Sequence, residues 1–201
     1  MGTTGIARND RADPQDMRPF GPASAARTTW QIDPATSRVE FAIGKRLAFV
    51  KRLTVTGRFT DVRGTIVLDE REPSAARADV TIGAASIDTG NARRDKHLRT
   101  ADFFDVERYP ALRFMSRRIT AIEAAAGRYR VTGDLTIRDV TREVQLDARY
   151  GPPSPVAGVR EPRMALTLTT ALHRADFGMG WSNPVIAIAD DLTVTLAVFL
   201  V

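Results

Sequence analysis

The sequence predicts an all-β fold: an antiparallel β-barrel of about eight strands with a short helix inserted near residues 91–100. From residue 29 onward apolar residues occupy every second position, which is the period of a strand with one dry and one wet face. Most of these segments follow one another closely, and short connections favour antiparallel pairing. Charges at the alternate positions argue against a parallel sheet covered by helices on both faces.

The strand predictions rest on the same alternation in each segment. In residues 53–59, for example, Leu53, Val55 and Phe59 share one face, whereas Thr54 and Arg58 share the other. A two-layer sandwich stays open as an alternative, but a closed barrel removes exposed edges and can hold a small ligand. The segments predicted as strands are residues 38–44, 53–59, 64–68, 78–82, 112–115, 129–137, 143–150, 164–172 and 192–200.

One segment interrupts this pattern. Residues 91–101 lack alternation and predict a short helix, with Asn91 as its N-cap. The apolar pair Phe103 and Phe104 follows directly. A helix with a bulky apolar tail between barrel strands is expected to close one end of the barrel.

The domain organisation follows from where the periodicity begins. Residues 1–28 are rich in Gly, Pro, Ala, Arg and Asp without periodicity, which predicts a disordered tail before a domain at 29–201. Charged residues interrupt this tail throughout, so it contains no apolar core of a signal peptide. No later stretch approaches the roughly 18 apolar residues of a membrane helix. The protein is therefore expected to be cytoplasmic.

The composition narrows the classes of function. The chain has no cysteine, which excludes disulfides and thiolate metal sites. The net charge of +5 would permit weak attraction to anionic lipid or nucleic acid. However, the basic residues are scattered, and no aromatic and basic cluster resembles a nucleic-acid stacking platform, so no nucleic-acid partner is predicted. The two histidines lack a second ligand at metal-binding spacing, and no phosphate loop is present, so neither metal nor cofactor is predicted.

Three polar features could have a functional role, two of them in catalysis. Asp88-Thr89-Gly90 resembles one aspartic-protease triplet, but that chemistry needs two carboxylates, and only a homodimer would supply the second. The simpler interpretation is a turn capped by Asp88, with Gly90 at a positive backbone angle. For His97 a structural role at the surface is favoured over catalysis. The mixed charges of residues 93–99 suit a solvated helix face with ion pairs, with a headgroup anchor or a membrane contact as the alternative.

The chain contains a series of short motifs, in this order: Ile32-Asp33-Pro34, Gly57-Arg58-Phe59, the stretch from Ser86 to Leu98, Asp102 to Val106, Tyr109-Pro110, Phe114-x-Ser116, Gly133 to Arg138, Val140-Thr141 and Arg174 to Met179. Together these motifs resemble the YceI-like family of polyisoprenoid-binding proteins. They occur in family order and cover about residues 29–201, and the ordered set is far more specific than any one motif. Among the departures, this chain has Lys45-Arg46 where many relatives have a histidine.

The resemblance implies a lipocalin-like barrel with an elongated apolar pore, and it brings no established catalytic residues. We therefore predict a non-enzymatic protein that binds an isoprenoid, an isoprenoid quinone or another long-chain lipid, for carriage, storage or sensing. The sequence is also compatible with a transient membrane contact and with a homodimer. The alternatives are a stress-related interaction protein with a packed barrel, and a lipid-modifying enzyme using Asp88, His97 or Asp176. The predicted pore residues are Phe41, Ile43, Val55, Ile66, Val80, Ile82, Phe114 and Leu135, and the predicted residues of the barrel ends are Phe103, Phe104, Phe177, Met179 and Trp181.

Overall fold

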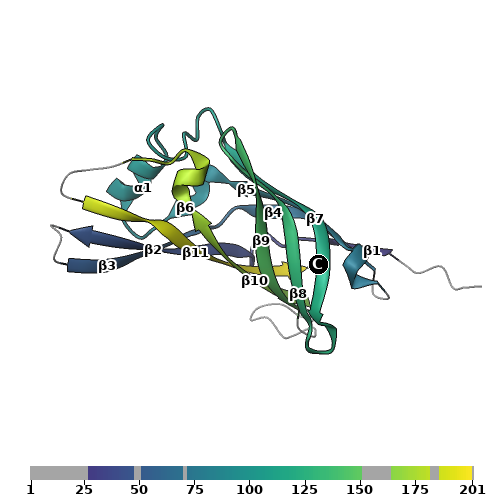
Figure 1. Ribbon diagram of the computed structural model, residues 1–201. Coiled ribbons are helices and arrows are strands. Elements are labelled where there is room, and N and C mark those ends of the chain that lie inside the picture. The colour runs from purple at the N-terminus through teal and green to yellow at the C-terminus, as the bar shows by residue number, and fades with distance from the viewer. Residues whose placement is uncertain (1–26, 48–50, 70–71, 151–163, 182–185, 201) are drawn as a thin grey trace, which may run out of the picture.

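The computed structural model describes residues 27–47, 51–69, 72–150, 164–181 and 186–200. Within these ranges eleven strands form one antiparallel sheet in the order β1-β4-β5-β7-β8-β9-β10-β11-β2-β3-β6 (Figure 1). The strands are β1 (Arg27–Gln31), β2 (Arg38–Leu47), β3 (Lys51–Phe59), β4 (Val62–Asp69), β5 (Arg77–Gly83), β6 (Ile87–Asp88), β7 (Ala111–Glu123), β8 (Arg128–Ile137), β9 (Val140–Tyr150), β10 (Met164–His173) and β11 (Ile186–Leu200).

The sheet curls into a barrel, and the segment after β1 joins two strands that are not neighbours in the sheet order, β4 and β11. The Ile32 N–H donates to the Gly64 carbonyl of β4 over 2.9 Å, and the Asp33 N–H donates to the Phe199 carbonyl of β11 over 2.9 Å. Buried Ser37 adds a second link, since its Oγ accepts from the Phe199 N–H at 3.0 Å. Two adjacent peptide units therefore bridge β4 and β11.

The alternation in the sequence becomes the inner and outer faces of this barrel. In β8, every second residue from Val131 to Ile137 is buried, whereas Thr132, Asp134 and Thr136 between them are only partly buried. β8 pairs along its whole length with β9, from Arg128 opposite Arg149 to Ile137 opposite Val140. Only two residues separate the two strands, which is the shortest common hairpin connection.

Short helices interrupt or follow the strands. The α-helix α1 (Ala92–Leu98) begins after Asn91, whose Oδ1 accepts from the Arg94 N–H at 3.0 Å, a cap that typically contributes ~1 kcal/mol. It lies at the end of the barrel where β2 ends and β11 begins (Figure 1). The 3-10 helices are η1 (Pro73–Ala75), η2 (Ala84–Ser86), η3 (Ala124–Ala126) and η4 (Arg174–Phe177).

The predicted fold class is confirmed, with differences at the edges. Each of the nine predicted segments lies within a strand, and the predicted helix is α1. The sheet has two further short strands, β1 and β6, and β1 begins at Arg27, before the predicted domain start at residue 29. The predicted disordered tail covers residues 1–28. Residues 1–26 lie outside the described ranges, whereas residues 27 and 28 belong to β1.

Candidate ligand-binding cavity

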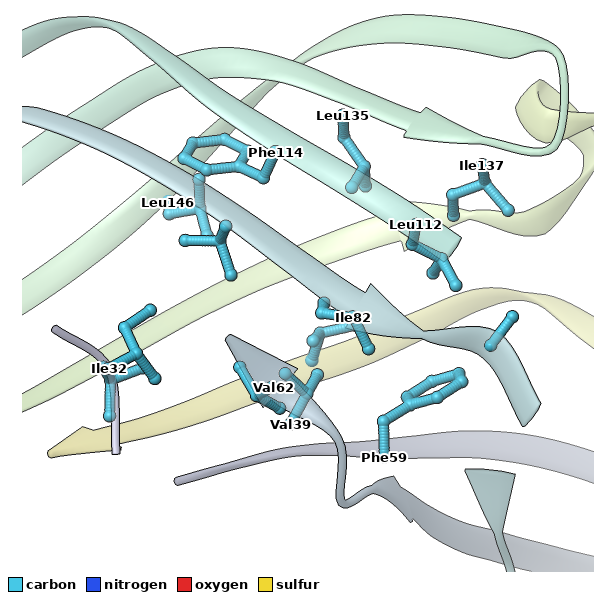
Figure 2. Close-up of a cluster of buried hydrophobic side chains, with 14 of the residues drawn as sticks. Ile32, Val39, Phe59, Val62, Ile82, Leu112, Phe114, Leu135, Ile137 and Leu146 are labelled. Atoms are coloured by element: carbon cyan, nitrogen blue, oxygen red, sulfur yellow. The ribbon is translucent and has the colours of Figure 1, made fainter. Parts of the chain in front are cut away.

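The barrel encloses a cavity of about 570 Å³. Each of the strands β2 to β11 contributes residues to its lining, and so do α1, η4 and the loop after α1. Figure 2 shows Phe114, Leu135 and Leu146 converging on the same interior as Val39 and Phe59 from the opposite wall. Nearly all lining side chains are aliphatic or aromatic, so the cavity presents an apolar surface to an occupant.

The structure brings together almost all of the residues predicted from sequence. Trp181 is the exception, because it does not line the cavity. Ligand contact by these residues stays a prediction. Those that line the cavity are Phe41, Ile43, Val55, Ile66, Val80, Ile82, Phe103, Phe104, Phe114, Leu135, Phe177 and Met179.

Aromatic rings pack around the α1 end of the cavity. The Phe59 ring meets the Phe104 ring edge-on, with 5.5 Å between the ring centroids. Trp181 lies 5.7 Å from Phe103 and 5.3 Å from His97, again between centroids. Trp181 therefore supports the lining residue Phe103 from behind. The Phe59–Phe104 and His97–Trp181 pairs are edge-to-face, and such pairs add to the stabilisation from apolar burial alone.

Gly57 is required where Phe41 crosses the neighbouring strand. The two residues are opposite each other in the β2–β3 pairing. A Cβ atom at Gly57 would lie 2.4 Å from Cζ of Phe41 and 2.7 Å from Cγ2 of Thr89. The absent side chain thus leaves the space at Gly57 to the Phe41 ring and the Thr89 methyl group.

Arg174 in η4 holds this end of the cavity together, although sequence reasoning did not single it out. Its side chain is only 12% exposed and forms an ion pair with Asp190, with 3.0 Å between Nη2 and Oδ1. It also donates to backbone carbonyls on both sides of the residues 182–185, namely those of Met179, Trp181, Ile188 and Ala189. β11 has its register shift between Ile188 and Leu192, so Arg174 also fixes this bulge.

The charged residues of α1 differ from the predicted solvated face with ion pairs. Asp95 is 7% exposed, and its carboxylate accepts from both the N–H and the hydroxyl of Thr89. Arg94 donates from Nε to Thr89 Oγ1 over 2.7 Å and from Nη2 to the Thr89 carbonyl over 2.9 Å. Arg94 also lines the cavity. The prediction of a solvated face with ion pairs therefore agrees with the exposed Arg93 and Lys96 but is wrong for Arg94 and Asp95.

The Asp88-Thr89-Gly90 motif forms a turn, as the simpler interpretation predicted. Asp88 Oδ1 accepts from the Gly90 N–H at 2.9 Å, and Gly90 has a positive φ of 70°. Asp88 Oδ2 accepts from Arg58 Nη2 at 2.8 Å. The Gly90 N–H and the Arg58 guanidinium both favour the carboxylate, so the pKa of Asp88 lies below its ordinary value.

Removing the Asp88 charge is expected to change the acid sensitivity of the fold. Because the folded pKa is lower than the unfolded one, the stabilisation is present above about pH 4 and is lost as the pH falls through the folded pKa. The melting temperature of Asp88→Asn should therefore lie below that of wild type at neutral pH, and the two should converge in acid. Thermal unfolding at several pH values checks this, and a difference that stays constant down to about pH 2 would contradict it.

The catalytic candidates do not themselves line the cavity. His97 Nε2 lies 2.8 Å from Asp102 Oδ2, and both side chains are well exposed, which fits the predicted structural role. Neither Asp88, His97 nor Asp176 is among the lining residues. In the described ranges, no three His, Asp or Glu side chains are grouped as metal ligands would be. Nor does any helix there have the length and apolar character to cross a bilayer.

An antiparallel barrel around a large apolar cavity is the architecture of proteins that enclose a small apolar ligand. Comparison with known families agrees with this class: the model of the YceI-like domain matches residues 30–200. The chain belongs to the YceI-like domain family.

Relatives and solved structures resemble the chain to different extents. UPF0312 protein ECA1782 of Pectobacterium atrosepticum is 39% identical over 129 residues, which are 64% of each chain. Protein YceI of Escherichia coli O157:H7 is 35% identical over 130 residues, 65% of each chain. The matches thus span slightly less than two thirds of these relatives.

Three solved structures share the fold. The Campylobacter jejuni YceI protein has a TM-score of 0.60 and 27% identity, covering 77% of this chain and 90% of its own. Burkholderia cenocepacia BcnA has a TM-score of 0.69 and 21% identity, covering 84% and 98%. A polyisoprenoid binding domain from Saccharophagus degradans has a TM-score of 0.57 and 16% identity, covering 85% and 97%.

Proposed function

We propose that the protein binds a long-chain apolar molecule inside its barrel, for carriage, storage or sensing, without chemical conversion. The ligand class is a polyisoprenoid, an isoprenoid quinone or a similar amphiphile. The observation that carries this proposal is the cavity of about 570 Å³ with its apolar lining. Pockets for small ligands typically have volumes of roughly 300–1,000 Å³.

The driving force is the removal of an apolar chain from water. Each buried methylene contributes ~0.8 kcal/mol, so about ten buried carbons contribute ~8 kcal/mol before ordering costs. Buried Phe114 and Leu146 on one wall, and Val39 and Phe59 on the opposite wall, show that both sides of the cavity offer hydrocarbon surface to such a chain. The polyisoprenoid-binding neighbour from Saccharophagus degradans supports the ligand class through a shared fold.

The cavity also weighs against the two alternatives. A packed barrel that acts only as an interaction protein would fill its interior with side chains, whereas this interior holds a large open volume. A lipid-modifying enzyme would bring its acid or base to the substrate. The candidates Asp88 and His97 are instead engaged with Arg58 and Asp102, outside the lining.

Mass spectrometry of an organic extract tests the proposal directly. The full chain is purified from the cells that make it naturally, beside a mock purification from cells that lack it. We expect one long-chain lipid in near-stoichiometric amount, because an apolar ligand of this size leaves a dry cavity slowly. An extract that matches the mock preparation in every lipid would contradict the proposal.

A further inference from the structure

One lysine belongs to the inner face of β2. Val39, Phe41 and Ile43 alternate along this strand and line the cavity, and Lys45 continues the same alternation and also lines it. Lys45 is partly buried and lies between Leu53 of β3 and Ile188 of β11. At about 3.3 Å per residue, it is ~13 Å beyond Phe41 along the strand.

The charged residues of the lining all carry the same sign. They are Lys45, Arg94 and Arg174, and in the described part of the chain no Asp or Glu lines the cavity. Arg174 and Lys45 belong to one end, since Arg174 donates to the carbonyl of Ile188, the residue opposite Lys45. α1, which carries Arg94, lies at this end as well (Figure 1). We call this set of three residues the cationic end.

These three cations differ in what they already contact. Arg174 already donates hydrogen bonds to backbone carbonyls and forms an ion pair with Asp190, and Arg94 already donates two hydrogen bonds to Thr89. Lys45, by contrast, has no hydrogen bond or ion pair to any residue in the described ranges.

The nearby acidic residues do not neutralise Lys45. In the bulge that follows Ile188, Asp190 pairs with Arg174 and Asp191 pairs with His173. The ammonium group of Lys45 is therefore free to bind an anion brought by a ligand, which would gain a charge-assisted hydrogen bond at the cavity lining.

We propose that the cavity takes a long-chain amphiphile with an anionic headgroup, a carboxylate or a phosphate, and that Lys45 binds this headgroup at the cationic end. The inference rests on the proposed function and narrows its ligand class. Arg94 is the second contact, because Thr89 occupies only one edge of its guanidinium. The apolar chain extends from there past Ile43 and Phe41 into the barrel.

The test compares probes that share one chain and differ in headgroup. Dodecanoate, dodecyl phosphate and the neutral dodecanol are titrated into the full chain by calorimetry near pH 8. We expect at least about tenfold tighter binding of one or both anions than of dodecanol, since hydrogen bonds to charged groups are roughly twice as strong as neutral ones. Which anion binds more tightly distinguishes a carboxylate headgroup from a phosphate.

Matched variants attribute this preference to Lys45. Lys45→Met should remove most of the preference while leaving dodecanol binding unchanged, and Lys45→Arg should retain it. Lys96→Met is the control, because Lys96 is exposed on α1 and does not line the cavity. Equal binding of all three probes to the wild-type protein, or an undiminished preference in Lys45→Met, would overturn this inference alone. Failure of all three probes to bind would overturn the proposed function with it.

Discussion

Arg174→Met is expected to lower the free energy of unfolding by about 3 kcal/mol. The substitution keeps much of the aliphatic stem but removes the donors to four backbone carbonyls and the ion pair with Asp190. Carbonyls left without donors in a partly buried site cost ~1–3 kcal/mol each, although some regain water. Equilibrium unfolding in urea measures the change.

A second arginine provides the control for Arg174. Arg117 pairs with Asp134, but its side chain is 63% exposed. Exposed ion pairs typically contribute less than about 1 kcal/mol, so Arg117→Met should change stability little. Because Arg174 fixes the β11 bulge next to Ile188, its loss should also weaken ligand binding, whereas Arg117→Met should not. Equal stability losses in the two variants would contradict the role of Arg174.

Much of the barrel could be predicted because its walls obey a two-residue period. In β5, Val80 and Ile82 were predicted from sequence to line the pore, and both are buried and line the cavity. The period does not reveal which strands are partners at the ends of a sheet. β1 and β6 are short and pair with β4 and β3 from a distance in sequence, so the pattern alone could not locate them.

The residues of the cationic end could not be assigned to the cavity from the two-residue period alone. Lys45 follows Phe41 and Ile43 at the same spacing, which is a signal that was available, but a charged residue is normally assigned to the wet face. Arg174 gave no comparable signal, because its acceptors are carbonyls of a turn and a bulge up to 15 residues away. Asp95 became buried because the preceding turn places two Thr89 donors around its carboxylate.

Ala148→Trp is expected to weaken the binding of a long apolar ligand about 30-fold. Ala148 is buried on β9, lines the cavity and lies between Tyr129 of β8 and Leu168 of β10. Because open volume lies directly before its methyl group, an indole there should occupy space that a ligand would otherwise fill. Excluding two to three methylenes at ~0.8 kcal/mol each costs ~2 kcal/mol, which corresponds to about 30-fold in affinity.

Ala171→Trp makes the same substitution on the outside of the barrel. Ala171 is exposed on β10 between two residues that line the cavity, Thr170 and Leu172, so its side chain lies on the opposite face. Geranylgeraniol, a neutral isoprenoid alcohol, is a suitable calorimetric probe because its binding does not depend on the charge of Lys45. Ala171→Trp should bind it as the wild-type protein does. Undiminished binding to a folded Ala148→Trp protein would place the ligand outside the barrel, because a chain inside the cavity could not avoid the indole.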